Sequence, residues 1–220
     1  MVQVATSLLN ASEEKILDVI HNLDNSGTNY FHIDVMDGEF VKNNTHDKML
    51  DFCEYITHSS RTPMDVHLMV KDIKNFVDSY AIFNPNIITF HFEACKDENE
   101  VFEIIKYIKE KVRRVGIAIN PDTPIDAIKK FLPYIHEVLV MTVVPGEGGQ
   151  KIIESTIEKI GELNKIRTEE NLDFDIEADG GINVQNAEKI KENGADILVA
   201  GTAILKAADY KVIIDELKQE

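Results

Sequence analysis

Short apolar runs typical of buried strands alternate with longer charged segments along the whole chain. The segments between the runs place apolar residues at i, i+3, i+4 and i+7, the spacing of a helix that buries one face. Examples of such segments are 12–23, 74–83, 98–112 and 152–166. The runs with the length and composition of strands are Gln3–Leu9, Tyr30–Met36, Met64–Val70, Asn86–Phe92, Arg114–Ile119, Glu137–Met141, Asp173–Ala178 and Asp196–Ala200.

About eight strand–helix units therefore follow one another without a linker, and that is the number that closes a parallel barrel. The sequence predicts a protein of the α/β class, with one (β/α)8 TIM barrel formed by residues 1–220. At 220 residues and 44% hydrophobic content, the chain is long enough for one substantial core. The alternative, an open doubly wound sheet, usually has a Gly-x-Gly-x-x-Gly turn after its first strand. The segment SLLNASEEK (7–15) lacks that turn.

The alternation of side chains along a strand shows which residues enter the barrel. In the second strand, Phe31, Ile33 and Val35 form the apolar set that should face the helices. Four strands have polar inward sets: Tyr30, His32, Asp34 and Met36; Asp65, His67 and Met69; Thr89, His91 and Glu93; Asp175, Glu177 and Asp179. Barrel interiors are normally apolar, so these groups must satisfy one another or a ligand.

Four of these inward residues indicate a functional site: His32, Asp34, His67 and Asp179. A paired core histidine would explain any one of them alone. Together they should meet at the carboxyl ends of the strands, where barrel active sites lie. Two imidazoles and two carboxylates suit Zn²⁺, Fe²⁺, Mn²⁺ or Co²⁺. We expect one divalent transition-metal ion; these ligands do not select among the four metals, and we take Zn²⁺ as the first one to test.

The other residues of these types receive simpler interpretations. Asp37 follows the second strand and is either a neighbour of the metal ligands or a turn residue. The histidines that fall in helical or loop stretches are interpreted as solvated surface residues; they are His21, His46, His58 and His136.

Glycine turns follow the last three predicted strands. Each alone is explained by a tight turn, but three on adjacent strands fit a phosphate site built from late loops and helix N-termini. The turns are Gly146-Glu147-Gly148-Gly149, before a helix expected from near Lys151, then Gly180-Gly181 and Gly201-Thr202. The formal net charge is −16, so an anion must be held locally by amides, helix N-termini or a bound cation.

The same charge argues against nucleic acid and anionic membranes as partners. No apolar stretch approaches the ~18 residues of a membrane span, and residues 1–15 lack the features of a signal peptide. Cys53 and Cys95 form no Cys-x-x-Cys pair, which is typical of incidental thiols in a reducing compartment. We expect a soluble, cytoplasmic protein.

Several longer segments also follow one another in a familiar order. They are Ser7-Leu8-Leu9, HIDVMDGEFV (32–41), DVHLMV (65–70), His91-Phe92-Glu93, GIAINPDTP (116–124), VLVMTVVPGEGGQ (138–150), IEADGGI (176–182) and GADILVAGTAI (194–204). In these segments the chain resembles the ribulose-phosphate 3-epimerase family over nearly its whole length. The resemblance implies a metal-dependent isomerase of the pentose phosphate pathway that interconverts D-ribulose 5-phosphate and D-xylulose 5-phosphate.

The resemblance also implies roles for individual residues. His32, Asp34, His67 and Asp179 match the metal ligands, and Asp34 and Asp179 also match the two acids that transfer protons. Thioethers that line the site correspond to Met36, Met69 and Met141. The matching substrate contacts are Ser7, His67, Gly146, Glu147, Gly148, Gly149, Gly180, Gly181, Gly201 and Thr202. We expect a small sugar phosphate as substrate and a homo-oligomer in solution.

These residue types suit the implied chemistry. Inverting the carbon beside a carbonyl group requires removal of one proton and return of another to the opposite face. Two carboxylates on opposite sides of a planar enediolate can do this as base and acid, exchanging roles with direction. A metal ion would stabilise the enediolate, and the two coupled acids should titrate as a unit.

The chain departs from the family pattern at Val144, at Glu147 and in the loop 39–50. These positions lie over the predicted mouth, so a related ketose phosphate such as D-allulose 6-phosphate is the alternative substrate. We expect the Glu147 side chain to turn to solvent or to pair with Lys42 or Lys48. Orotidine-phosphate decarboxylase is disfavoured because DVHLMVKD lacks its Asp-x-Lys-x-x-Asp array. A non-catalytic sugar-phosphate-binding barrel is disfavoured because a binder needs no pair of opposed acids.

Overall fold

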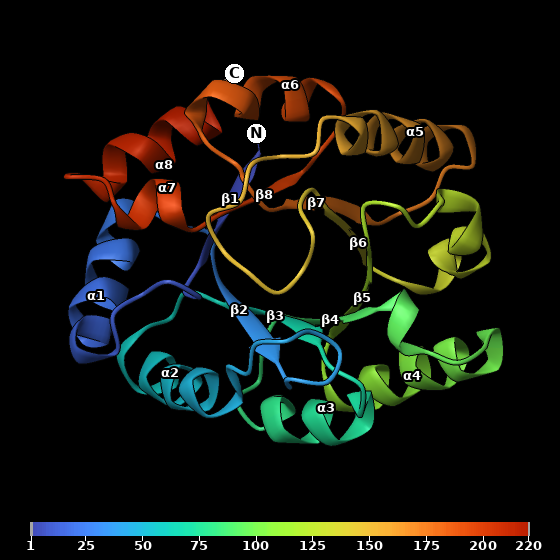
Figure 1. Ribbon diagram of the computed structural model, residues 1–220, viewed down its shortest axis with the longest axis horizontal. Helices are drawn as coiled ribbons and strands as arrows, with labels where there is room; N and C mark the ends of the chain where they lie inside the picture. Colours follow the sequence, from blue (N-terminus) through green and yellow to red (C-terminus); the bar gives the residue numbers. More distant parts are fainter. Residues whose placement is uncertain (1, 220) are drawn as a thin grey trace.

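The computed structural model describes residues 2–219. The strands form a closed parallel barrel in which each strand pairs with its neighbours in the chain, and the last pairs with the first (Figure 1). The predicted barrel is confirmed. The strands are β1 (Gln3–Ser7), β2 (Tyr30–Met36), β3 (Met64–Met69), β4 (Ile87–His91), β5 (Arg114–Ile119), β6 (Glu137–Met141), β7 (Asp175–Asp179) and β8 (Ile197–Ala200).

Helices surround the barrel and cover its outer face (Figure 1). In the helix over Glu98–Lys111, the Asp97 side chain caps the first turn by accepting a hydrogen bond from the Glu100 N–H, and four buried aliphatic side chains face the barrel. The helices are α1 (Ile16–Ser26), α2 (His46–Ser59), α3 (Ile73–Ala81), α4 (Glu98–Lys111), α5 (Ser155–Glu169), α6 (Val184–Glu192), α7 (Thr202–Leu205) and α8 (Tyr210–Lys218). Short 3₁₀ turns are η1 (Glu13–Lys15), η2 (Phe92–Ala94), η3 (Ile125–Ala127) and η4 (Lys129–Tyr134).

Two helical segments differ from the sequence prediction. Strand β5 is followed by the 3₁₀ turns η3 and η4 instead of an α-helix, and Pro133 lies inside η4, where it cannot donate a backbone hydrogen bond. Helix α5 begins at Ser155 and not near Lys151. The Ile153 N–H instead bonds the Thr142 carbonyl at 2.8 Å, which ties this segment back to the end of β6.

The predicted division between inward and outward side chains is confirmed for β2. Phe31, Ile33 and Val35 belong to the hydrophobic core between barrel and helices. His32 and Asp34 lie inside, and Asp34 pairs in register with His67 of β3. The prediction for Glu93 is corrected, because β4 ends at His91 and Glu93 lies in the turn η2.

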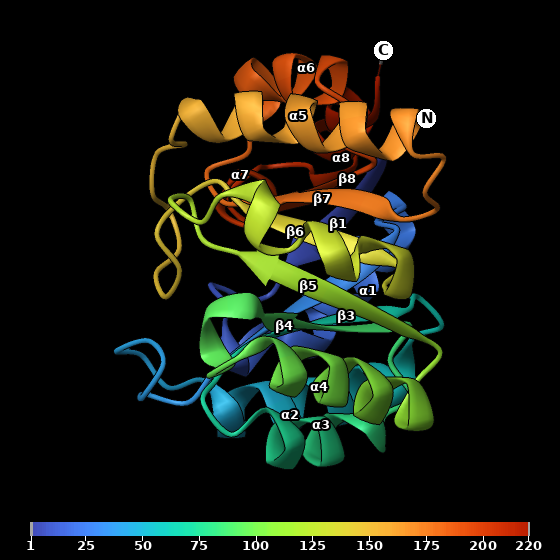
Figure 2. The ribbon, with the colours of Figure 1, turned by 90° about the vertical axis from the view of Figure 1, so that its right-hand side faces the viewer.

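Two long loops project from the carboxyl end of the barrel, and Figure 2 shows both on the same side. They follow β2 and β6, and the Asn43 side chain of one donates a 2.7 Å hydrogen bond to the Gly146 carbonyl of the other. Asp37 is a turn residue here, because its carboxylate accepts N–H bonds from Glu39, Phe40 and Lys71.

Two histidines interpreted as solvated are half-buried, which corrects that prediction. The His46 ring lies 4.8 Å from the Phe76 ring, and His136 Nδ1 accepts a 3.2 Å hydrogen bond from the Val115 N–H. His21 and His58 are exposed, as predicted.

Cys53 is buried and Cys95 is partly buried. Burial raises the pKa of each thiol to about 12, so both are poor nucleophiles at neutral pH. None of the helices between residues 2 and 219 has both the length and the apolar character needed to cross a membrane.

Candidate active site

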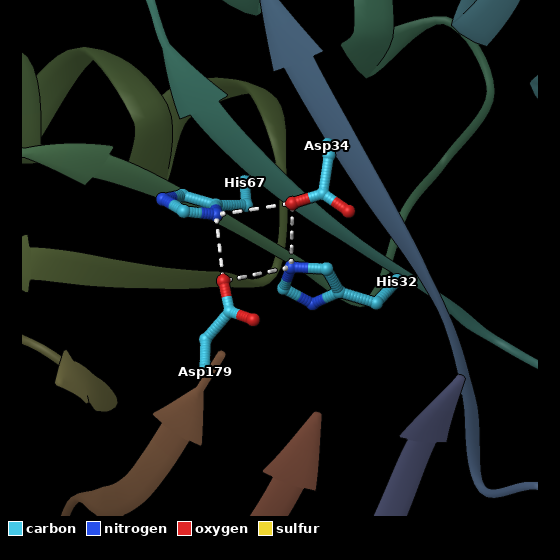
Figure 3. Close-up of side chains that lie close together, drawn as sticks. All are labelled: His32, Asp34, His67 and Asp179. Carbon is cyan, nitrogen blue, oxygen red and sulfur yellow. Dashed lines mark ion pairs between the residues drawn. The ribbon is translucent and has the colours of Figure 1, made fainter. Parts of the chain in front are cut away.

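The four side chains singled out in the sequence converge inside the barrel near the carboxyl ends of the strands (Figure 3). Strand β2 supplies His32 and Asp34, β3 supplies His67, and β7 supplies Asp179. His32 Nε2 lies 3.4 Å from Asp34 Oδ1 and 3.7 Å from Asp179 Oδ2. His67 Nδ1 lies 3.6 Å and 3.4 Å from the same two oxygens. The two nitrogens and two oxygens therefore alternate around one point.

The second nitrogen of each imidazole reaches a buried partner on the far side of its ring. His32 Nδ1 donates to Asp65 Oδ2 at 2.6 Å and lies 3.2 Å from Glu177 Oε1. His67 Nε2 lies 3.0 Å from Nε2 of His91 on β4. These bonds orient both rings toward the cluster. Asp65, Glu177 and His91 were predicted to face inward, but the sequence analysis assigned them no role. The alternation of side chains along a strand does not reveal which inward groups contact one another.

Electrostatics in the cluster favour positive charge between the two carboxylates. Burial alone lowers the pKa of His32, but Asp65 and Asp34 raise it well above its ordinary value. Burial raises the pKa of Asp34, yet the facing His32 and His67 hold it below its usual range. The pKa of His67 is also raised, because Asp179 and Asp34 more than offset the lowering caused by burial. A bound cation would be stabilised by the same two carboxylates.

A cavity of about 290 Å³ opens above the cluster. It brings together the predicted residues Ser7, Asp34, Met36, Met69, Met141, Gly146, Glu147, Gly148, Gly149, Asp179, Gly180, Gly181, Gly201 and Thr202. His32 and His67 have no exposed surface and do not line the cavity. Asn10 also lines it and was missed by the sequence analysis, although its position just after the first predicted strand is a usable signal. The Asn10 amide donates a 3.3 Å hydrogen bond to Thr202 Oγ1.

The loops after β6 and β7 pack so closely that one position requires glycine. Gly181 has φ +67°, and a Cβ atom there would lie 2.7 Å from the Ile152 backbone nitrogen. Both the left-handed backbone and this contact exclude a side chain. The glycine turns therefore meet on one wall of the cavity, as predicted. Lysine and arginine are absent from the described residues that line it.

Glu147 lies at the rim with an exposed side chain. The alternative pairing with Lys48 is wrong, since the Lys48 ammonium donates to the carbonyls of Leu9 and Ala11. Within residues 2–219, Glu147 makes no ion pair with Lys42 either. Exposure to solvent, the first expectation, is confirmed.

Comparisons with known proteins place the whole chain in one family. The profile of the Ribulose-phosphate 3 epimerase family matches residues 3–205. Ribulose-phosphate 3-epimerase from Bacillus subtilis is 36% identical over 219 residues, covering 99% of both chains. The enzyme of that name from Methanocaldococcus jannaschii is also 36% identical, covering 100% of this chain and 91% of its own.

Solved structures support the fold alone. The crystal structure of KGPDC from Streptococcus mutans has a TM-score of 0.71, with 11% identity over 99% of this chain and 96% of that one. At such low identity, the shared barrel says nothing about a shared substrate. The full-length family match and the two relatives are decisive: the chain belongs to the ribulose-phosphate 3-epimerase family, a family of isomerases.

Proposed function

We propose that this protein is a cytoplasmic, metal-dependent epimerase that inverts C3 of a ketose phosphate, interconverting D-ribulose 5-phosphate and D-xylulose 5-phosphate. The main support is the placement of Asp34 and Asp179. They come from different parts of the barrel, present oxygens within 4.8 Å of one another and line one cavity. Inversion of a carbon requires two such groups, one for each face. The names of the relatives point to the same reaction.

The cluster fits a divalent transition-metal ion. Two imidazole nitrogens and two carboxylate oxygens suit Zn²⁺, Mn²⁺, Fe²⁺ or Co²⁺. Within the described chain, His32 Nε2 and His67 Nδ1 are buried and have no hydrogen-bond partner, so their lone pairs are available to an ion. When bound, the ion would stabilise the negative charge that develops on the substrate oxygens as the C3 proton leaves.

The residues of the chain would divide the remaining work. One of the two aspartates removes the C3 proton, and the other returns a proton to the opposite face. Their roles exchange with the direction of the reaction. The Ser7 hydroxyl orients Asp34 by donating a 2.7 Å hydrogen bond to Oδ2. The thioethers of Met36, Met69 and Met141 form apolar walls that limit water near the reacting carbons.

The phosphate would lie against the glycine turns after β6, β7 and β8. Backbone N–H groups there can donate to a phosphate, and the helix α7 begins directly after β8. Since Lys and Arg do not line the described cavity, the amides must provide most of the recognition. This arrangement lets a protein with a net charge of −16 bind an anion.

A substrate panel combined with metal analysis tests this proposal. The purified protein is assayed with D-ribulose 5-phosphate and D-allulose 6-phosphate, before and after exhaustive chelation. We expect the pentose phosphate to have the higher kcat/KM, chelation to abolish turnover, and added Zn²⁺, Mn²⁺, Fe²⁺ or Co²⁺ to restore it. Full activity in a sample shown to be metal-free would refute the metal dependence. A preference for D-allulose 6-phosphate would refute the substrate assignment.

A further inference from the structure

The two imidazoles of the cluster are supported in different ways. His32 bonds a carboxylate directly through its second nitrogen. His67 instead faces a third imidazole, with its Nε2 3.0 Å from Nε2 of His91. His91 Nδ1 in turn lies 3.0 Å from Glu93 Oε2. His67 and His91 are fully buried, so water cannot replace these contacts.

The positions of the protons along this chain depend on one another. An imidazole that binds a cation through Nδ1 carries its proton on Nε2. For His67 that proton points at His91 Nε2, which must accept it. His91 then carries its own proton on Nδ1 and donates it to Glu93. Reversing any one of these bonds would place the proton of His67 on the nitrogen that faces the cluster.

The Glu93 carboxylate is held so that its two oxygens have different partners. Oε1 accepts the Asn120 N–H at 2.8 Å and the Thr123 hydroxyl, which leaves Oε2 for His91. The loop 120–123 is itself fixed, because the Lys159 ammonium of α5 donates to three of its carbonyls at 2.6–3.1 Å. Glu93 therefore cannot rotate freely or exchange its oxygens.

We propose that Glu93 is a positioning residue that acts through His91 to keep the proton of His67 on Nε2, leaving Nδ1 free for the metal ion. This inference rests on the metal centre proposed above. Glu93 and His91 themselves are neither ligands nor acid–base groups. His91 Nε2 accepts the N–H of His67, and Glu93 Oε2 accepts the N–H of His91.

Glu93→Gln tests this role because the amide is not symmetric. Its carbonyl oxygen should take the place of Oε1, where two donors point, so its NH₂ group would face His91 Nδ1 and donate to it. Both histidines would then reverse their protons. We expect the dissociation constant for Zn²⁺ or Co²⁺, measured by competition with a chelator, to rise by roughly 10–100-fold. Saturating metal should largely restore turnover, which a catalytic group lost from the site would not allow.

The nitrogen chemical shifts of the His91 ring, measured by NMR, read the proton position directly and do not depend on the proposed reaction. We expect Nδ1–H in the unaltered protein and Nε2–H in Glu93→Gln. The matched control is Glu98→Gln, which changes an exposed carboxylate that pairs with Lys130 on the surface. It should change neither the shifts nor the affinity.

Two results would overturn the inference: Nε2–H on His91 in the unaltered protein, or unchanged metal affinity in folded Glu93→Gln. If Glu93→Gln does not fold, His91→Phe keeps a ring of similar shape and removes the acceptor for His67. Unchanged metal affinity in that variant would also contradict the inference. Absence of epimerase activity with the expected His91 shifts and metal affinities would refute the proposed reaction and leave the positioning role intact.

Discussion

The Ser7 hydroxyl donates a 2.7 Å hydrogen bond to Asp34 Oδ2 and thereby decides which oxygen of that carboxylate faces the cluster. The other oxygen, Oδ1, lies 3.4 Å from His32 Nε2 and 3.6 Å from His67 Nδ1. Ser7 and Asp34 are almost fully buried where they line the cavity.

Ser7→Ala should therefore slow the proposed reaction. A hydrogen bond to a charged group contributes about 1.5–3 kcal/mol. We expect kcat/KM for D-ribulose 5-phosphate to fall at least about tenfold, while the circular dichroism spectrum stays unchanged. Ser12→Ala is the matched control, because the Ser12 side chain makes no cap bond at the start of its helical turn. Equal activity in the two variants would contradict a role for Ser7.

Asp34→Asn and Asp179→Asn should separate the two proton transfers. Each variant should lose net epimerisation, and the remaining acid should still exchange the C3 proton on its own face with deuterated solvent. Mass spectrometry of recovered substrate measures that exchange. Because both residues are proposed ligands, the metal content of each variant must be determined first. Unchanged turnover in metal-loaded Asp34→Asn would refute the assignment.

Glu147→Phe tests whether the rim residue opposes the proposed substrate. A carboxylate about 6 Å from a phosphate dianion would repel it by roughly 1 kcal/mol or more. The exposed Glu147 side chain can instead turn to solvent. We expect kcat/KM for D-ribulose 5-phosphate to change less than about tenfold, or ~1.4 kcal/mol. A much larger gain would mean that this loop suits a different ligand.

Glu137→Gln should change how stability depends on pH. Burial, together with the nearby Asp65 carboxylate, raises the pKa of Glu137 from 4.5 to about 8. As pH rises from 4.5 to 8, the unfolded chain ionises this group and the folded chain keeps it protonated. Folding is therefore progressively destabilised, by up to about 1.4 kcal/mol per pH unit.

Glutamine removes this term and keeps an acceptor for the Thr89 hydroxyl, which lies 2.9 Å from Glu137 Oε1. Urea denaturation at several pH values should show Glu137→Gln gaining stability relative to the unaltered protein as pH rises across this window. Glu188→Gln, at an exposed position of α6, is the control. A constant difference between pH 5 and 8 would contradict the raised pKa.

The alternation of side chains along a strand was sufficient to predict which of them point into the barrel. A strand has a period of two residues, so identifying β2 and β3 places His32, Asp34 and His67 on the inner face. Asp179 and the glycine turns follow from the rule that barrel loops meet at the carboxyl ends. These features are local, which is why the pattern alone predicts them.

Contacts between distant loops could not be predicted in the same way. The bond from Asn43 to the Gly146 carbonyl joins residues 103 positions apart, and the bond from the Lys159 ammonium to the Asn120 carbonyl joins residues 39 positions apart. Neither produces a periodic signal in the sequence. The same holds for Glu93, whose role depends on a turn that replaces the expected end of β4.

Closure of the barrel by β1 and β8 has a consequence for how the protein matures during synthesis. Thr6 pairs in register with Ala200, and a Cβ atom on Gly201 would lie 3.2 Å from the Ser7 side chain. Strand β1 therefore cannot pair with β8 until nearly all of the residues described here have left the ribosome. Until then both β1 and β7 have an unpaired edge. Such an edge can pair with another nascent chain and lead to aggregation. The turn after β8 belongs to the proposed phosphate site, so substrate binding there would require the closed ring, whereas the four cluster residues lie on strands that are made earlier.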